Sequence, residues 1–288
     1  MILNNKIDFA VIFRVNNANP NGDPLNGNRP RVNYDGLGEI SDVCIKRKMR
    51  DRLMESPLKR AIFVQSDDNK ADNHVNLRSR ADAVLDSLKT PNEIKERACK
   101  EWFDVRAFGQ VFAFKSSGNK KNKAEGEKTS DEGVSIGIRG PVSVHPAFSD
   151  KRVEVTSTQI TKCTSNEGDG IKRASDQMGM KHRVDRGIYA FYGSINPQLA
   201  QRTGFSDEDS KDIKSILPRL FENDASSARP EGSMEILKVI WWQHNCPNGQ
   251  TSSAKVHRSL KWQPKEDGTI DVSFDNIPGL NPEVIEGY

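Results

Sequence analysis

Basic side chains are concentrated in one short stretch of the sequence, from Ser41 to Arg60. This stretch holds seven lysines and arginines against three acidic residues, whereas from Lys265 onward one lysine faces six acidic residues. Lys and Arg neutralise phosphates, and basic residues on successive helical turns can follow a nucleic-acid backbone. A solvated helix flank would have the same composition, so the residue types alone leave nucleic-acid binding and a plain surface role equally open. The net charge of +3 adds little to either interpretation.

A second candidate is the loop "NANPNGDPLNGNRPRV" (residues 17–32), whose only charged residues are Asp23, Arg29 and Arg31. Asn and Gly permit backbone turns with positive φ, and their short side chains let main-chain N–H groups approach a phosphate. Residues 19–31 are therefore expected to lie against a nucleic acid or a neighbouring subunit, with Arg29 and Arg31 as contacts, or to form a simple surface connection.

Histidine and cysteine residues offer few alternatives. His145 or His182 could act as the general base of an RNA-cleaving site, but the sequence places no nucleophile or second base beside either one. A metal site of His244, Cys246 and His257 would have only three ligands at loose spacing. Walker, GxGxxG and GxSxG motifs are absent from the sequence. We therefore predict no cofactor, no metal ion and no catalytic residue.

Two further patterns have structural explanations. The stretch "RGIYAFYGS" partly resembles the strand of RNA-recognition motifs whose aromatic rings stack on bases. Its aromatics Tyr189, Phe191 and Tyr192 fall on both faces of a strand, so at least one is expected in the core. The acidic cluster "SDEDSKD" resembles a cation site, but acidic residues also favour the first turn of a helix.

The composition predicts a globular, cytoplasmic protein. The chain has 288 residues, of which 35% are hydrophobic, and it shows neither an internal repeat nor a boundary between two cores. The four cysteines form no CxxC pair, and the first residues lack a signal-type pattern. Apolar runs stay below the roughly 20 residues that cross a bilayer, so no membrane partner is expected.

Hydrophobic periodicity predicts the elements that must position the candidate residues. Residues 6–15 alternate as a strand with one core face and one more polar face, and Ser41 caps a helix on which Ile45, Met49 and Leu53 share a stripe. The elements that follow are strand 61–64, helix 92–102, strand 134–144 with a bend at Gly140 and Pro141, hairpin 150–186, strand 187–195, a helix capped by Ser206, and strand 234–242 buried on both faces. Residues 115–133 hold a single apolar residue and predict an excursion without a core.

This order of elements predicts an α+β fold. With the excursions removed, it corresponds to an elaborated ferredoxin-like βαββαβ core. Helices would cover one face of the antiparallel sheet and leave the other face, or its edges, for a ligand.

The chain resembles the backbone subunit of type I-C CRISPR interference complexes, also called Cascade, a Csd-type member of the RAMP superfamily. Six ordered blocks carry the resemblance: "NPNGDP", "SDVCIKRKMRDRL", "WFDVRAFGQVF", "SIGIRGPV", "MGMKHRVDRGIYAFYGSI" and "RTGFSDED". The resemblance implies a hand-like protein with an RRM-like palm (1–64, 90–112, 134–149 and 187–262), finger insertions (about 65–89 and 113–133), a thumb hairpin (about 150–186) and an acidic C-terminal segment (263–288).

The resemblance also implies a function in antiviral defence. Several copies would stack helically along one CRISPR RNA (crRNA), hold its phosphates without reading sequence and leave its bases free to pair with target DNA. The other partners would be the crRNA-processing, large and small Cascade subunits, and nuclease activity would belong to other subunits. The residues expected to bind RNA are Arg14, Asn21, Arg29, Arg31, Lys46, Arg47, Arg50, Arg139, Lys172, Arg173, Lys181 and His182.

Two catalytic alternatives stay open. One is an RNA-processing endonuclease of related fold that uses His145 or His182. The other is a backbone that cuts target RNA with an aspartate and a metal ion, as in type III relatives, for which Asp23 would be the residue to test.

Overall fold

An eight-stranded antiparallel sheet organises the part of the chain that the computed structural model describes, residues 1–55, 57–88, 90–114, 134–161, 178–265 and 268–288. Across the sheet the strands run β14 (Pro282–Glu286), β11 (Met234–Gln243), β1 (Ile7–Ala18), β10 (Met178–Ile195), β8 (Ala147–Arg152) and β4 (Leu37–Ile40). Two more strands, β7 (Val142–Val144) and β9 (Val155–Thr161), pair with opposite ends of β10. The predicted excursions at 115–133 and 162–177 lie outside the described residues.

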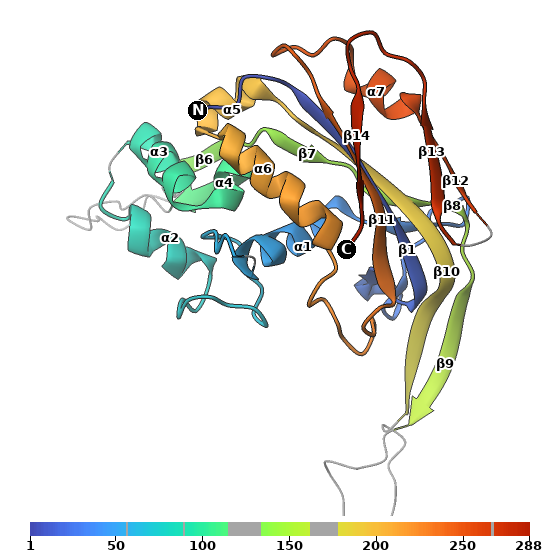
Figure 1. Ribbon diagram of the computed structural model, residues 1–288. Helices are drawn as coiled ribbons and strands as arrows, with labels where there is room; N and C mark the ends of the chain where they lie inside the picture. Colours follow the sequence, from blue (N-terminus) through green and yellow to red (C-terminus); the bar gives the residue numbers. More distant parts are fainter. Residues whose placement is uncertain (56, 89, 115–133, 162–177, 266–267) are drawn as a thin grey trace, which may run out of the picture.

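The predicted α+β fold is confirmed. The elements β1, α1 (Asp42–Glu55), β7, β10, α6 (Asp207–Ile216) and β11 follow the order βαββαβ, and the core strands lie in the order β11, β1, β10, β7. Helices α1, α4 (Phe103–Phe108), α5 (Pro197–Thr203) and α6 lie on one side of the sheet (Figure 1). The main apolar core lies between these two layers and includes Phe9, Phe13 and Phe191.

The helix starts follow the capping chemistry that the sequence predicts. The hydroxyl of Ser41 accepts a hydrogen bond from the N–H of Cys44 at the start of α1, and Ile45, Met49 and Leu53 are buried beneath that helix. Ser206 and Asp209 form a reciprocal capping box at the start of α6, which accounts for the acidic cluster. The helix predicted at 92–102 is α3 (Pro91–Glu101), capped by Thr90.

The second face of the sheet is not free, contrary to the prediction. Helix α7 (Ser253–Ser259) and the hairpin of β12 (Leu260–Pro264) and β13 (Ile270–Phe274) cover it (Figure 1). The face of β1 that was expected to be more polar includes Ala10 and Ile12, which are fully buried in one cluster with Trp242 and Val256. The face of β1 that was predicted to be more polar is therefore packed against the C-terminal segment through Ala10 and Ile12.

Because both faces of the sheet are covered, the aromatic residues of "RGIYAFYGS" in β10 do not form an open surface for stacking on bases. Tyr189 and Phe191 are fully buried in the helix-side core, as expected for at least one of the aromatics. Tyr192 points to the other face, where its ring lies 5.0 Å from the ring of His257 in α7. These rings are not open to bases as they would be in an RNA-recognition motif.

A buried carboxylate joins the sheet to this C-terminal layer. Asp8 of β1 accepts a hydrogen bond of 2.9 Å from His244, which follows β11, and it lies 3.6 Å from Nε2 of His257. Burial alone would raise the pKa of Asp8, but hydrogen bonds from His244 and Ser253, together with the charge of Lys6, lower it. Burial also lowers the pKa of His257, because the charged imidazolium would lose its hydration. Asp8 is therefore held as a carboxylate.

The strand predicted at 61–64 is wrong. These residues join no sheet; instead the N–H groups of Phe63 and Val64 donate to the carboxylate of Asp104 at 2.6 and 3.1 Å. The same carboxylate accepts a hydrogen bond of 2.9 Å from Nε of Arg50. A buried side chain thus satisfies backbone groups that a neighbouring strand would otherwise pair.

The bend predicted at Gly140 and Pro141 separates two strands. Before it, β6 (Val134–Arg139) pairs with β5 (Gly109–Phe114) in a small separate sheet, and after it β7 joins the main sheet. Gly140 is required there because a Cβ atom would lie 2.3 Å from the carbonyl oxygen of Ala107.

The acidic C-terminal segment is part of the fold. Strand β14 closes the edge of the main sheet beside β11. Its carboxylates are partly neutralised, since Glu283 pairs with Lys214 at 2.6 Å and Glu286 pairs with Lys238 at 2.5 Å. Among the described residues, no helix has both the length and the apolar character needed to cross a membrane.

The segment predicted as the first finger depends on a buried arginine. Arg80 of α2 (Leu77–Leu85) is 3% exposed, donates to both oxygens of Asp72 at 2.7 and 2.8 Å, and donates to the carbonyl of Phe63 at 2.7 Å. The hydrogen bonds from Arg80 lower the pKa of Asp72 to about 2.

We expect acid to loosen this finger before the sheet. A lowered carboxyl pKa means that the pair stabilises the fold fully above about pH 4, and that this contribution is lost as the pH falls toward 2. Hydrogen–deuterium exchange, corrected for intrinsic rates, should show opening of residues 65–88 relative to β1 between pH 5 and 2.5. Asp72→Asn should cause the same opening at pH 5. Asp67→Asn, which alters a carboxylate that is 92% exposed and pairs with Lys70, is the control and should not. Equal protection of the finger at both pH values would contradict the prediction.

Candidate nucleic-acid interface

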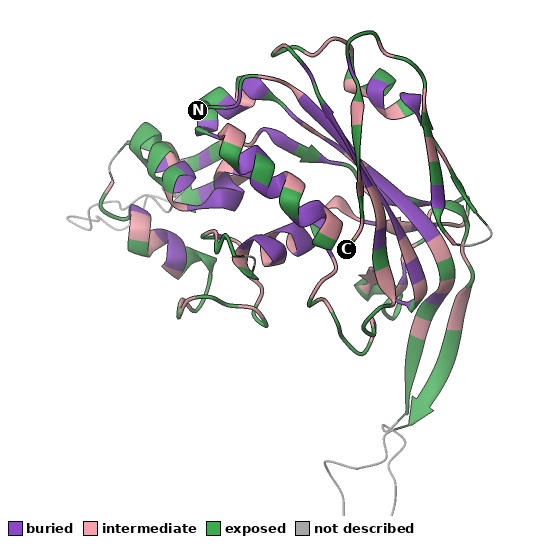
Figure 2. Ribbon diagram, viewed as in Figure 1, coloured by how far each residue is buried: buried purple, intermediate pink, exposed green. Residues whose placement is uncertain are grey.

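The most prominent surface feature is a two-stranded ribbon that projects from the sheet (Figure 1). It pairs Val155–Thr161 of β9 with Met178–Val184 of β10, which confirms these strands of the predicted hairpin 150–186. Most of its side chains are exposed (Figure 2). A two-stranded ribbon is marginal in isolation, but β10 continues without a break for 18 residues into the centre of the sheet. The thumb, as we call residues 155–161 and 178–184, is therefore anchored in the core.

The loop 17–32 folds against the thumb. It forms a miniature hairpin of β2 (Gly22–Asp23) and β3 (Arg29–Pro30), joined by a 3-10 turn, η1 (Pro24–Asn26). Positive φ angles at Asn17 (51°) and Asn28 (61°) confirm that its asparagines permit left-handed backbone. A Cβ atom at Gly22 would lie 1.9 Å from Oδ1 of Asn28, so a larger residue there would displace the Asn28 side chain.

Two of the predicted RNA-binding residues meet where this hairpin touches the thumb. The guanidinium of Arg29 donates to the hydroxyl of Ser157 at 2.8 Å, and Nδ1 of His182 lies 2.8 Å from the same hydroxyl. The three residues come from β3, β9 and β10. Segments more than 100 residues apart thus present a cation, a hydroxyl and an imidazole at one surface.

A groove of about 320 Å³ lies beside the thumb root. Lys181 and Arg183 line it together with hydroxyl, amide and apolar groups. Cross-strand pairing places Lys181 opposite Thr158 and Arg183 opposite Thr156, so both cations lie on one face of the ribbon. Arg183 also pairs with Asp185 at 3.2 Å, in a solvent-exposed contact of little strength. The remaining lining residues are Asn17, Thr158, Ile160, His182, Ser227, Ala228 and Pro230.

The basic residues of α1 are neutralised within the fold. Lys46 pairs with Asp42 at 2.9 Å, and Arg47 pairs with Asp51 at 3.3 Å and donates to the carbonyl of Val64. RNA binding by Lys46 and Arg47 stays a prediction, since their side chains are 23% and 27% exposed.

Arg50, which was expected to bind RNA, is largely buried in the fold. Its side chain is 11% exposed, bonds to Asp104 and lies over the ring of Phe108. The geometry therefore favours a structural role for Arg50.

Other predicted residues are also used by the fold. Asn21 accepts hydrogen bonds from the N–H and the hydroxyl of Ser41, which fixes the start of α1. Arg14 lies on the face covered by β12 and β13, where it pairs with Glu235 and donates to the carbonyl of Gly268. RNA binding by Arg14 stays a prediction, since its side chain is 18% exposed.

The other residues that were expected to bind RNA lie apart from the contact of Arg29, Ser157 and His182, or fall outside the described residues. Arg31 is partly exposed and pairs with Asp23 at 3.4 Å. Arg139 is exposed at the end of β6, which pairs with β5 in a small sheet separate from the sheet that carries the thumb. Lys172 and Arg173 lie outside the described residues.

Sequence reasoning missed several residues at the thumb. They are Ser157, Arg183, and the exposed cations Lys151, Arg152 and Arg186. The alternation in "KHRVDRG" is a signal that could have indicated Lys181 and Arg183 as neighbours on one face.

Two of the candidate catalytic and metal-binding residues, Asp23 and His244, have structural roles in the described fold. Asp23 caps η1 by accepting from the N–H of Leu25. His244 donates to Asp8 through Nε2 and accepts from the N–H of Gln250 at Nδ1, so both ring nitrogens are occupied. Within the described ranges, no three His, Cys, Asp or Glu side chains are grouped so that they could hold a metal ion.

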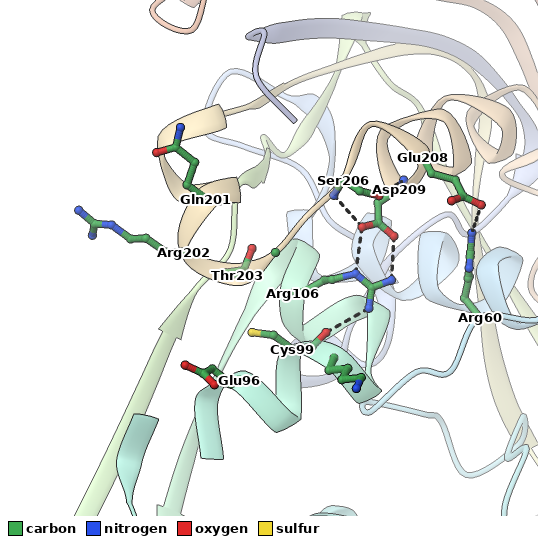
Figure 3. A pocket seen from close by; sticks show the side chains of 12 residues that line it. Arg60, Glu96, Cys99, Arg106, Gln201, Arg202, Thr203, Ser206, Glu208 and Asp209 are labelled. Carbon is green, nitrogen blue, oxygen red and sulfur yellow. Dashed lines mark hydrogen bonds and ion pairs between the residues drawn. The ribbon is translucent and has the colours of Figure 1, made fainter. Parts of the chain in front are cut away.

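A cavity of about 600 Å³ among α3, α4, α5 and α6 lies away from the thumb (Figure 3). Its wall contains a buried ion pair in which Arg106 donates to both oxygens of Asp209 at 2.7 and 3.0 Å. Burial would raise the pKa of Asp209, but the hydrogen bonds and charge of Arg106 lower it. Arg60 also pairs with Asp212 at 2.7 Å and with the exposed Glu208 at 3.4 Å, so ion pairs join the elements around this cavity.

Comparison with known proteins gives consistent results. A family model described as "CRISPR-associated protein Cas7" matches residues 5–277. A Haloferax volcanii protein with the same description is 26% identical over 243 residues, which are 82% of this chain and 69% of that protein. Chains in two solved structures titled "CRISPR RNA-guided surveillance complex, pre-nicking" and "CRISPR RNA-guided surveillance complex" give TM-scores of 0.46 and 0.41 at 14% and 15% identity. Both alignments cover 82% of this chain, with 78% and 68% of the other chains.

Proposed function

Because the chain belongs to the Cas7 family of CRISPR-associated proteins, we propose that it is a non-catalytic backbone subunit of a type I-C surveillance complex. Several copies polymerise along one crRNA in the cytoplasm. Each copy holds the phosphates of the guide without reading its sequence, and the exposed bases pair with target DNA. Its further partners are the crRNA-processing, large and small subunits of the complex.

One observation carries this proposal: the thumb and the 17–32 hairpin present cations on both faces of a projecting ribbon, with Arg29 on the face of Ser157 and His182 and with Lys181 and Arg183 on the other face. Arg29, Lys181 and Arg183 have no buried acidic partner among the described residues, in contrast to Arg50 in α1. Side chains that already carry a buried counter-charge gain less from a phosphate, because the existing pair must first be broken. The thumb root, rather than α1, is therefore the main phosphate-binding surface in this proposal.

The test is the binding of labelled single-stranded RNAs of unrelated sequence by the purified protein at several salt concentrations. Similar affinities are expected, and log K should fall linearly with log salt, with a slope of about −0.7 for each phosphate contacted. Electron microscopy should show single particles without RNA and linear assemblies with it. Strong preference for one sequence, or absence of binding in dilute buffer, would overturn the proposal.

The same purified protein also tests the alternative that the chain is an RNA-processing endonuclease. A crRNA repeat should be protected and remain intact. Cleavage that is lost on His182→Ala would instead identify an endonuclease that uses the imidazole beside Ser157.

A further inference from the structure

Tyr34 is a fully exposed aromatic side chain on a rigid turn. Its relative exposure is 109%. The side chain of Asn33 accepts from the N–H groups of Asp35 and Leu37 at 3.0 and 2.9 Å, and the N–H of Gly36 donates to the carbonyl of Asn33 at 3.0 Å. Gly36 has a φ of 79°, which an L-residue adopts with strain. The turn is therefore fixed by its own hydrogen bonds, and it holds the ring of Tyr34 in solvent.

This turn packs against the root of the thumb. The carbonyl of Gly36 accepts from the N–H of Val153 at 3.1 Å, and Leu37 pairs with Arg152 across the β4–β8 ladder. The aliphatic part of the Arg152 side chain runs beside Gly36, since a Cβ atom there would lie 3.3 Å from Cγ of Arg152. Tyr34 and an exposed guanidinium thus stand where β8 leads into the thumb.

The surroundings of Tyr34 distinguish a nucleobase from a protein partner. A protein interface would place such a ring within a contiguous apolar patch. Among the residues within two positions of Tyr34, Asn33 and Asp35 are polar and only Val32, which is 48% exposed, is a large apolar residue; the cation Arg152 packs on the same turn at Gly36. An exposed ring with a cation on the same turn is an arrangement with which proteins hold unpaired bases, because every base has a π-face and the cation attracts a phosphate.

We propose that Tyr34, with Arg152 beside it, stacks on one unpaired base of the RNA bound along the thumb. This inference rests on the proposed function, because it needs a single strand at the thumb root. It adds an aromatic contact to a surface that otherwise holds only phosphates. The contact is tolerant of sequence, since it uses the face of the base and not its edge.

The test uses a set of single-stranded RNAs, each with 2-aminopurine at a different position. The probe is excited at a wavelength that tryptophan does not absorb, and its fluorescence is measured. Wild-type protein should quench the probe at one position per bound copy. Tyr34→Ala should lose that quenching and weaken binding roughly 5- to 100-fold, whereas Tyr34→Phe should retain both. Leu25→Ala is the matched control: Leu25 is 98% exposed in the neighbouring hairpin, and its replacement should change neither readout.

The outcomes separate this inference from the proposed function. RNA binding and quenching by Tyr34→Ala at wild-type levels would overturn the stacking site and leave the scaffold intact. Loss of assembly in Tyr34→Ala with unchanged quenching would assign Tyr34 to a contact between protein copies and would also overturn it. Failure of the wild-type protein to bind any single strand would overturn the proposed function itself.

Discussion

Replacing Asp104 by Ala is expected to lower the free energy of unfolding by about 3–5 kcal/mol, the cost of breaking a buried ion pair from one side. Asp104 is 1% exposed and accepts three hydrogen bonds, from Arg50, Phe63 and Val64. Its removal leaves a largely buried guanidinium and two backbone N–H groups without an acceptor, and each such group costs free energy. Denaturant titration followed by circular dichroism measures the loss, with the m-value as a check on two-state behaviour.

A double-mutant cycle tests whether Arg50 belongs to this network. Arg50→Met alone should also destabilise the protein, and Arg50→Met combined with Asp104→Ala should cost less than the sum of the single changes. The control is Asp185→Ala, which removes a partly exposed carboxylate next to the thumb, bonded to Thr156 and Arg183, and should change the unfolding midpoint much less. Additive single effects would show that Arg50 does not depend on Asp104, and would return Arg50 to the set of candidate RNA contacts.

Local patterns predicted the central elements because their causes lie within a few residues. The alternation of Phe9, Val11 and Phe13 positions β1, and the caps Ser41 and Ser206 begin α1 and α6. The break at Gly140 and Pro141 separates β6 from β7. In each case the side chain that fixes the element is next to the backbone that it fixes.

The predictions that failed depend on distant residues. The segment 61–64 looked like a strand, but its N–H groups bind a carboxylate 40 residues away. The second face of the sheet looked free because the segment that covers it, α7 with β12 and β13, follows the last core strand. Strands β4 and β14 were missed because they are short and lie at the edges of the sheet.

The same distinction applies to the candidate site. Counting basic residues favoured α1, since the sequence cannot show that Asp104 would reach Arg50 across a separation of 54 residues. The predicted hairpin placed Lys181 and His182 on a projecting ribbon, but the contact of Arg29 with Ser157 spans 128 residues and needed the structure. Tyr34 gave no periodic signal, because its exposure depends on the turn that Asn33 fixes.

Replacing Arg29, Lys181 and Arg183 together by Ala is expected to weaken binding of single-stranded RNA roughly 100-fold near physiological salt. Each side chain lies at the thumb root and lacks a buried acidic partner among the described residues, so each can release a counterion by meeting a phosphate. The slope of log K against log salt should become shallower by about 2–3 for the triple variant. Fluorescence anisotropy with two RNAs of unrelated sequence measures both quantities, and both RNAs should lose affinity alike.

The matched comparison is Lys46→Ala with Arg47→Ala in α1. These side chains already pair with Asp42 and Asp51, so this double variant should lose less affinity, and change the slope less, for each charge removed. Circular dichroism should show both variants folded, because the groups replaced are at least partly exposed. An α1 variant that lost more affinity per charge than the thumb variant would place the main phosphate track on the helix, where internal ion pairs would then have to open on binding.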